Sequence, residues 1–211
     1  MTGPSWKARL QHEPLFGCFV TFASLALTEL TARLGFDFTV IDNEHGTMNE
    51  EALENMVRGS HAAGVPSVVR VPYNRAEYLR KALVFGGDGV QVPLVDTVDH
   101  ARQAVGATLF PPHGDRGVAF LTRAADYGMC PDKSRYLTNA NADRLVSVHI
   151  ETVQAVDNLD TILEVNDIDV YFLGPGDLAI SMGYADNPQH PDVLATIATC
   201  IKSIRAHGEI A

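Results

Sequence analysis

Short apolar runs alternate with helical patterns along most of this chain. Six of these runs are mostly β-branched and apolar on both faces, which is typical of parallel strands covered by helices on both sides. They span residues 17–22, 38–41, 67–71, 90–93, 146–150 and 170–173. The pattern therefore predicts six parallel strands.

Helical segments with recognisable ends separate these strands. Ser24 is expected to cap a helix whose Leu27, Leu30 and Leu34 share one face. The later helices are expected to begin at the capping box Thr47-Met48-Asn49-Glu50 and at Asn74, Thr97, Thr152 and Asp192, with glycines closing helices at Gly35, Gly64, Gly86, Gly106 and Gly208. The result is six βα units without a break in composition, so we expect one domain over residues 1–211.

Six βα units fit either an open doubly wound sheet or a (β/α)8 barrel that lacks its last two units. A dinucleotide-binding sheet carries G-x-G-x-x-G after its first strand, and this sequence has no such motif there. Charged residues instead stand at or just beyond the strand ends: Asp42, Glu44, His45, Arg70, Glu151 and Asp177. A barrel brings such residues to one mouth, which favours an α/β fold with barrel architecture.

The length of the chain limits this barrel. A complete barrel typically needs ~250 residues, and the chain has 211. We therefore expect the barrel domain to be C-terminally incomplete, with its first and sixth strands as open edges. Open edges pair with other chains, so these residues alone are expected to be prone to aggregation.

Charge and composition exclude several classes of partner. Sixteen Lys and Arg residues against 26 Asp and Glu residues give a net charge of −10, so neither nucleic acid nor an anionic membrane is expected as a partner. No stretch of about 18 apolar residues is present, and the N-terminus lacks the apolar core of a signal peptide. Cys18, Cys130 and Cys200 lie far apart, which favours reduced thiols and a cytoplasmic location.

Two carboxylates follow neighbouring strands. Glu151 comes directly after residues 146–150, and Asp177 follows the Gly174-Pro175-Gly176 turn. If they face each other they need a shared proton or a cation between them, and Mg²⁺ suits carboxylate oxygens while keeping positions open for substrate and water. The alternative is that both acids only cap the helices that follow them.

Three further side chains are candidates for chemistry. Arg70 interrupts an apolar strand, so it either binds an anionic substrate or enolate oxygen, or forms an internal ion pair with Asp42 or Glu44. His45 stands beside carboxylates at a strand end and is a candidate general acid or base. His149 shares a strand face with the residue two positions later, and it lines the mouth, ligates a metal or packs in the interior. No lysine stands at a strand end, which disfavours a Schiff-base aldolase.

An ordered set of motifs carries these residues along the chain. The motifs are Ile41-Asp42-Asn43-Glu44-His45, Val69-Arg70-Val71-Pro72, Pro111-Pro112-His113-Gly114-Asp115-Arg116-Gly117, Ile150-Glu151-Thr152 and Leu173-Gly174-Pro175-Gly176-Asp177-Leu178. With them the chain resembles, from about Gly17 onward, the metal-dependent class II pyruvate aldolases of the HpcH/HpaI type. The resemblance implies a TIM barrel of the phosphoenolpyruvate/pyruvate type and, for a complete chain, a homo-oligomer that is usually a hexamer.

The same resemblance implies a reaction and a cofactor. The expected reaction is reversible cleavage of a 4-hydroxy-2-oxo acid to pyruvate and an aldehyde through a metal-stabilised enolate. Glu151 and Asp177 would hold the divalent metal, which would be Mg²⁺, Mn²⁺ or Co²⁺. The backbone N–H groups of Gly176 and Asp177 would bind the carboxylate of pyruvate.

The remaining site residues would act around that metal. By the resemblance, Arg70 would stabilise the enolate oxygen and His45 would take part in proton transfer. Asp42 and Glu44 would orient those two residues, and His149 would lie behind the metal ligands.

Two positions depart from the family pattern. Leu83-Val84-Phe85-Gly86 stands where the family has Leu-Asp-x-Gly, so Val84 replaces the Asp that partners the catalytic His. His149 stands where the family has Gln two positions before the metal Glu. These changes keep three functions open: aldol cleavage, an oxaloacetate decarboxylase or macrophomate-synthase-like enolate reaction, and a non-catalytic member of the family.

Overall fold

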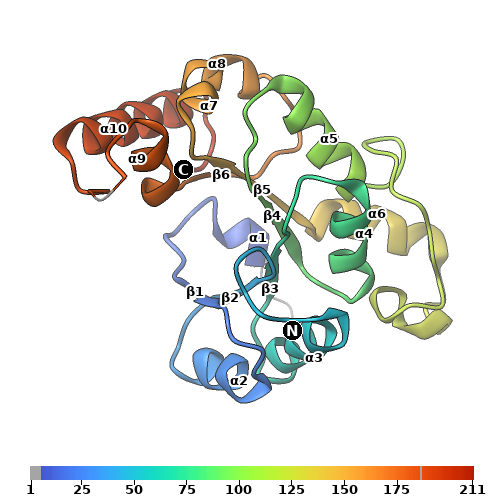
Figure 1. Cartoon of the computed structure of the whole chain (residues 1–211). Helices are drawn as coiled ribbons and strands as arrows, with labels where there is room; N and C mark the ends of the chain where they lie inside the picture. The colour runs from blue at the N-terminus through green and yellow to red at the C-terminus, as the bar shows by residue number, and fades with distance from the viewer. Residues whose placement is uncertain (1–5, 186) are drawn as a thin grey trace.

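Six parallel strands form one sheet in which each strand pairs with the next along the chain. The computed structural model describes residues 6–185 and 187–211. The strands are β1 (Gly17–Val20), β2 (Phe38–Asp42), β3 (Ser67–Arg70), β4 (Gly89–Val92), β5 (Leu145–Ile150) and β6 (Val170–Leu173). The sheet curls, and most of the helices lie on its outer side (Figure 1). The prediction of six parallel strands is confirmed.

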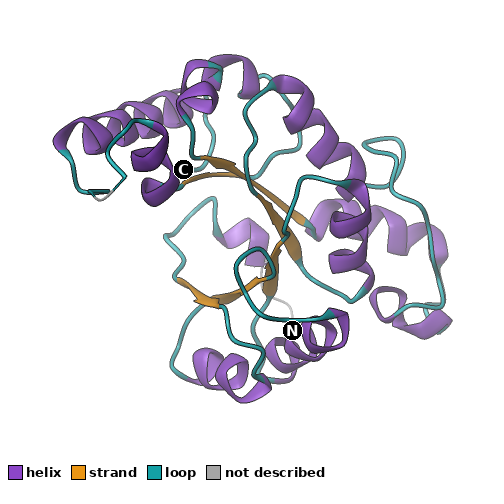
Figure 2. Cartoon of the chain, in the orientation of Figure 1, coloured by secondary structure: helices purple, strands orange, loops and turns teal. Residues whose placement is uncertain are grey.

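Helices follow every strand, so the six βα units are also confirmed (Figure 2). The helices are α1 (Trp6–Arg9), α2 (Leu25–Arg33), α3 (Glu50–Ala62), α4 (Ala76–Val84), α5 (Val98–Thr108), α6 (Lys133–Asp143), α7 (Val153–Asp157), α8 (Leu159–Ile162), α9 (Pro175–Ser181) and α10 (Pro191–Ala206). A short 3₁₀ segment, η1 (Arg123–Gly128), and α6 lie in the long connection between α5 and β5, where the pattern predicts no element. Within the described residues, no helix is both long enough and apolar enough to cross a membrane.

Several helix starts agree with the capping residues in the sequence. The side chains of Ser24, Thr97 and Thr152 accept hydrogen bonds from the backbone N–H groups three residues later, as N-caps do. Gly35 lies just past the end of α2 with a φ of 91°, a conformation that favours glycine. These boundaries follow from local chemistry and do not depend on the rest of the fold.

Other helix starts differ from the prediction. Asn49, not Thr47, caps α3 through the N–H of Ala52. Asn74 does not cap α4: Arg75 stands at the N-cap position without a side-chain cap hydrogen bond, and the amide of Asn74 donates to the carbonyl of His100. The expected starts and ends at Asp192 and Gly106 are also displaced, since α10 begins at Pro191 and α5 runs on to Thr108.

The apolar stripe of α2 faces outward. Leu27, Leu30 and Leu34 are 40%, 50% and 69% exposed, whereas Thr31 and Ala32 are buried. The side of α2 that packs inward carries small residues, because the neighbouring helix α3 approaches closely. The sequence thus predicted correctly that these three leucines share one face of α2. It did not predict that this face is exposed.

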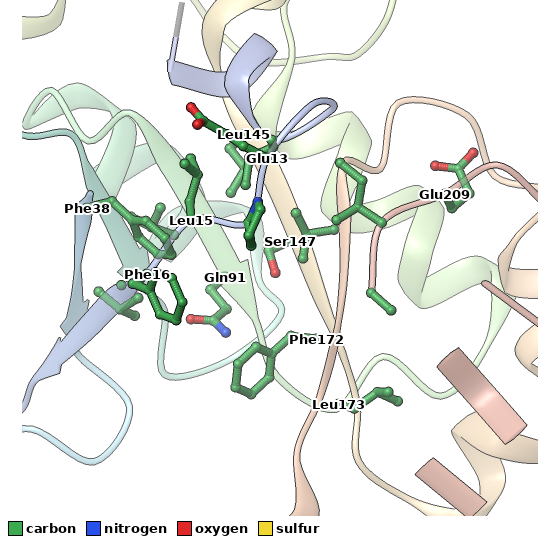
Figure 3. A pocket seen from close by; sticks show the side chains of 18 of the residues that line it. Glu13, Leu15, Phe16, Phe38, Gln91, Leu145, Ser147, Phe172, Leu173 and Glu209 are labelled. Carbon is green, nitrogen blue, oxygen red and sulfur yellow. The ribbon is translucent and has the colours of Figure 1, made fainter. Parts of the chain in front are cut away.

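Alternation along the strands divides the core into two layers. Side chains such as Ile41, Val69 and Val148 face the helices and are fully buried. The alternate positions face the concave interior, where Val68, Gln91, Ser147 and Phe172 line a cavity of about 1030 Å³ (Figure 3). Asp42, Arg70, His149 and Glu151 continue this inward-facing series at the carboxyl ends of their strands.

The ends of the sheet approach each other through side chains. Among the described residues, β1 and β6 share no strand pairing. The rings of Phe19 on β1 and Phe172 on β6 nevertheless lie 6.0 Å apart between centroids. The sheet is thus a curled half-barrel whose first and last strands meet through aromatic rings. Tyr171, within β6, donates its N–H to the carbonyl of Ile210 at 2.9 Å.

Candidate active site

Arg70 is the charged centre of the inward-facing group at the strand ends. Its Nε and Nη2 donate to the two carboxylate oxygens of Asp42 at 2.9 and 2.6 Å, and its Nη1 lies 3.2 Å from Glu44 Oε2. The Arg70 side chain is 13% exposed and that of Asp42 is fully buried. The internal ion pairs considered for Arg70 are therefore present, with both acids at once.

This network sets the charge of Asp42. Burial alone would raise the pKa of Asp42, but hydrogen bonds from Arg70 and from the backbone of His45 and Glu44 outweigh burial and lower it. The pKa of Glu44 is raised, since its burial outweighs the attraction of Arg70. Asp42 is thus kept ionised beside Arg70, whereas Glu44 binds a proton more readily than an ordinary glutamate.

The loop after β2 carries His45 to the surface. Asp42 Oδ1 accepts the N–H groups of Glu44 and His45, both at 3.1 Å, which folds the loop back over the strand end. A side chain at Gly46 would overlap the carbonyl oxygen of Asp42, so the turn needs glycine there. The His45 side chain is exposed, and within the described residues no hydrogen bond or ion pair of its ring is found.

Glu151 lies opposite this network at the end of β5. Its Oε2 lies 2.6 Å from Nδ1 of His149, and its Oε1 accepts the N–H of Leu94 at 2.9 Å. Burial would raise the pKa of Glu151, but the hydrogen bond and charge of His149, the N–H of Leu94 and the charge of Arg70 lower it overall. His149 therefore packs in the interior, in direct contact with the expected metal ligand.

Asp177 stands in the first turn of α9, next to the end of β6. β5 and β6 pair with Ile150 opposite Leu173, so Glu151 and the Gly174 turn continue neighbouring strands. A Cβ at Gly174 would lie 2.9 Å from Glu151 Oε2, so the glycine makes room for that carboxylate. Asp177 and Gly176 are exposed, and a Cβ at Gly176 would meet nothing within 4 Å.

This donor set fits a divalent cation. Within residues 6–185 and 187–211, no three His, Cys, Asp or Glu side chains cluster closely enough to hold a metal ion by themselves. The two carboxylates of Glu151 and Asp177 would leave further positions to substrate and water, as hard cations allow. Three acids, Asp42, Glu44 and Glu151, interact with the charge of Arg70, and Asp177 follows the strand next to that of Glu151, so negative charge is in excess and favours a cation.

Aromatic rings connect the two halves of the site. The guanidinium carbon of Arg70 lies 5.1 Å from the centre of the Phe19 ring, and His149 stacks on Phe172 with centroids 4.6 Å apart. With the contact between Phe19 and Phe172, these four side chains form an arc, which we call the aromatic arc. Sequence reasoning missed Phe19, Phe172 and Leu94. Strand alternation could have indicated the two rings, but Leu94 acts through its backbone and has no sequence signal.

Val84 lies at the other edge of the sheet from His45. Helix α4 runs back from the end of β3, and the residues just after it pair with the start of that strand, where Asp88 donates its N–H to the carbonyl of Ser67. His45 follows the opposite end of β2. The expected partnership between position 84 and His45 is therefore not possible within one chain, because the length of the strands separates the two residues.

A second polar cluster occupies that opposite edge. Asp88 Oδ2 lies 2.6 Å from His61 Nε2 and accepts the N–H of Ser67, while its Oδ1 lies 3.4 Å from Arg144. Arg123 Nη2 lies 3.1 Å from the other ring nitrogen of His61. Their positions in the sequence are scattered, and only the fold brings them together.

Known proteins are similar to this chain over most of its length. The family model described as HpcH/HpaI aldolase/citrate lyase matches residues 15–211. A 4-hydroxy-2-oxo-heptane-1,7-dioate aldolase of Escherichia coli (strain ATCC 8739) is 40% identical over 207 residues, which are 97% of this chain and 78% of the relative.

Solved structures with a similar fold also cover most of this chain. An HpcH/HpaI aldolase/citrate lyase family protein from Burkholderia cenocepacia J2315 has a TM-score of 0.90 and 36% identity, over 96% of this chain and 81% of that one. The citrate synthase SbnG has a TM-score of 0.88 and 28% identity, over 97% of this chain and 79% of that one.

Proposed function

Because this chain belongs to the HpcH/HpaI aldolase/citrate lyase family, we propose that it cleaves and forms 4-hydroxy-2-oxo acids, with pyruvate and an aldehyde as the products of cleavage. The chain is an enzyme of the aldolase type, a carbon–carbon lyase. The observation that carries the proposal is the pairing of Arg70, whose side chain is 13% exposed, with the buried Glu151, whose charges interact at the strand ends. Among the described residues, no lysine stands at a strand end.

Glu151 and Asp177 are the residues that would hold a divalent cation, either Mg²⁺, Mn²⁺ or Co²⁺. When bound, such a cation would supply Lewis acidity and a place for the two oxygens of a 2-oxo acid. The backbone N–H groups of Gly176 and Asp177, in the first turn of α9, would then donate to the substrate carboxylate. The exposure of both residues supports access by substrate.

The reaction itself needs a proton acceptor and a site for negative charge. In cleavage the 4-hydroxyl loses its proton, the C3–C4 bond breaks, the aldehyde leaves, and the electron pair forms the enolate of pyruvate. Uptake of a proton at C3 then gives pyruvate. Arg70 would stabilise the enolate oxygen with N–H groups that Asp42 and Glu44 orient. His45 would take the hydroxyl proton through a water, since its ring is free of other partners among the described residues.

The half-barrel supports a finer assignment of the fold. We propose that the six βα units correspond to the first six units of a (β/α)8 barrel of the phosphoenolpyruvate/pyruvate type, in one domain. The strand order and the curl that brings the rings of Phe19 and Phe172 together support this. A cytoplasmic homo-oligomer is part of the same proposal. Position 84 could reach His45 only from another copy of the chain.

The test is pyruvate release from 4-hydroxy-2-oxoheptanedioate, measured with lactate dehydrogenase and NADH. We expect release with Mn²⁺, none after thorough chelation, and recovery when Mn²⁺ is returned. Glu151→Gln and Asp177→Asn should lose activity, whereas Glu164→Gln and Asp157→Asn, which alter exposed acids elsewhere, should not. Full activity in chelated enzyme would contradict the metal site. Release of pyruvate from oxaloacetate alone would favour the decarboxylase alternative.

A further inference from the structure

The carboxylate of Glu151 is held at both oxygens by the protein itself. Oε1 accepts the backbone N–H of Leu94 at 2.9 Å, and Oε2 lies 2.6 Å from His149 Nδ1. The residue is 3% exposed, and Gly174 leaves only enough room for the carboxylate in this position. The orientation of Glu151 is therefore set by contacts from β5 and from the loop after β4.

His149 is fixed in one orientation. Its side chain is 1% exposed, and its ring stacks on Phe172 at 4.6 Å with an interplanar angle of 29°. Because an ionised carboxylate only accepts hydrogen bonds, Nδ1 carries the hydrogen. Nε2 is buried without a partner among the described residues, so the hydrogen bond to Glu151 is the one polar contact that this ring makes there.

Leu94 has a backbone conformation that leucine rarely adopts. Its φ is 53°, in the left-handed region, where side chains other than Gly, Asn and Asp are uncommon. The Leu94 side chain is 51% exposed, so core packing of that side chain does not explain the strain. What the conformation does achieve is to point the N–H of Leu94 at Glu151. Strained residues of this kind cluster where the surrounding structure needs them.

We propose that His149 and Leu94 form a two-point clamp that orients Glu151 as a metal ligand before the cation arrives. The clamp rests on the function proposed above. Each carboxylate oxygen has a second lone pair, so one stays available on each oxygen after both hydrogen bonds are made. The two residues are positioning residues: they act through Glu151 and need not touch the substrate. The side-chain half of the clamp depends on the histidine at position 149.

Two substitutions at His149 separate the contribution of its hydrogen-bond donor from that of its aromatic ring. In His149→Asn the amide nitrogen lies as many bonds from the backbone as Nδ1 of histidine, so a donor to Glu151 is retained and the ring is lost. In His149→Phe the ring and its stacking on Phe172 are retained and the donor is lost. A purely structural role in core filling predicts that the asparagine variant is the worse of the two. The clamp predicts the reverse for metal binding.

The experiment titrates the full chain with Mn²⁺ and follows free Mn²⁺ by electron paramagnetic resonance, with thermal unfolding in EDTA measured in parallel. We expect His149→Phe to bind Mn²⁺ about 10- to 100-fold more weakly than wild type, the range found when partners of metal ligands are removed. His149→Asn should remain within about 3-fold of wild type. If His149→Phe does not fold, His149→Leu serves in its place. Wild-type affinity in the donor-free variant, or greater loss in His149→Asn, would overturn the clamp.

Substitutions at Leu94 test whether its left-handed backbone conformation matters for metal binding. Leu94→Gly adopts the left-handed conformation without strain and should keep the Mn²⁺ affinity of wild type, whereas the β-branched Leu94→Val should weaken it. Equal affinities in these two variants would remove Leu94 from the clamp. A wild-type chain that binds no Mn²⁺ would instead overturn the metal site of the proposed function. Binding by wild type but not by Glu151→Gln, together with unchanged binding by His149→Phe, would overturn the clamp alone.

Discussion

Replacing Arg70 by lysine should destabilise the fold even though the charge is kept. Arg70 makes three nitrogen–oxygen contacts, two with Asp42 and one with Glu44. A lysine ammonium is a point charge on a flexible stem and can keep one of these contacts. Hydrogen bonds to charged groups contribute about 1.5–3 kcal/mol each, so losing two should lower the free energy of unfolding by about 3–6 kcal/mol.

The pH dependence of this loss gives it a signature. The pKa of Asp42 is lowered, so its contribution to stability is present above its unfolded pKa of about 4 and is lost as pH falls through the folded pKa. Without the guanidinium, the buried Asp42 should bind a proton more readily in the folded state. The stability difference between wild type and Arg70→Lys should therefore be largest near pH 7 and shrink as the pH approaches 4.

Urea unfolding followed by circular dichroism at several pH values measures this difference, provided that the two proteins have equal m-values. Arg70→Met serves as the control that removes every contact and should be at least as unstable as Arg70→Lys at pH 7. A difference of less than about 1 kcal/mol at pH 7 would mean that the network contributes no more than a surface ion pair. A difference independent of pH would mean that Asp42 is not the group affected.

Three further changes test other parts of the structure. Gly174→Ala should displace the Glu151 carboxylate and weaken Mn²⁺ binding about 10-fold in the same titration, with little loss of thermal stability; unchanged binding would mean that the carboxylate can move aside freely. Asp88→Asn should lose about 2–3 kcal/mol of unfolding free energy at pH 7 through its contact with His61, and the loss should disappear below about pH 4 because the pKa of Asp88 is lowered; urea unfolding at both pH values checks it. Arg116 is 4% exposed and makes no ion pair among the described residues, and burial lowers its pKa to about 10, so Arg116→Met should raise the free energy of unfolding by roughly 1–3 kcal/mol at pH 7; a marked loss in urea unfolding would show that the guanidinium stabilises the fold.

The sheet was predictable because each of its strands is a short local signal. Residues 170–173 were predicted as a strand with the bounds that β6 has, and the other strands agree within one or two residues at each end. Helix starts were predictable where one capping residue stands alone, as at Ser24 and Thr97. They failed where two polar residues compete, as with Thr47 and Asn49, since the choice depends on which backbone groups the fold brings near.

The site was predictable as a set of residues and not as a set of contacts. The strand ends identified Arg70 and Glu151, and alternation placed His149 on the same face as Glu151. The hydrogen bond from Leu94 depends on a left-handed backbone that no property of leucine indicates. The sequence alone could have predicted that Val84 and His45 lie far apart, because a helix after a parallel strand must end near the start of the next strand.

The aromatic arc has a mechanical consequence. Hydrogen bonds join β1 through β6 in one continuous series, but among the described residues the return from β6 to β1 has only side-chain contacts, such as the Phe19–Phe172 ring pair and the ion pairs of α1 with Asp169 and Asp37. Such contacts resist displacement far less than a strand ladder does. Opening or closing the curl by a small hinge would therefore change the span between Arg70, which rests on Phe19, and His149, which rests on Phe172. The curvature of the sheet therefore sets the distance between Arg70 and His149. A contact that held β1 and β6 in a fixed relation would also fix that distance.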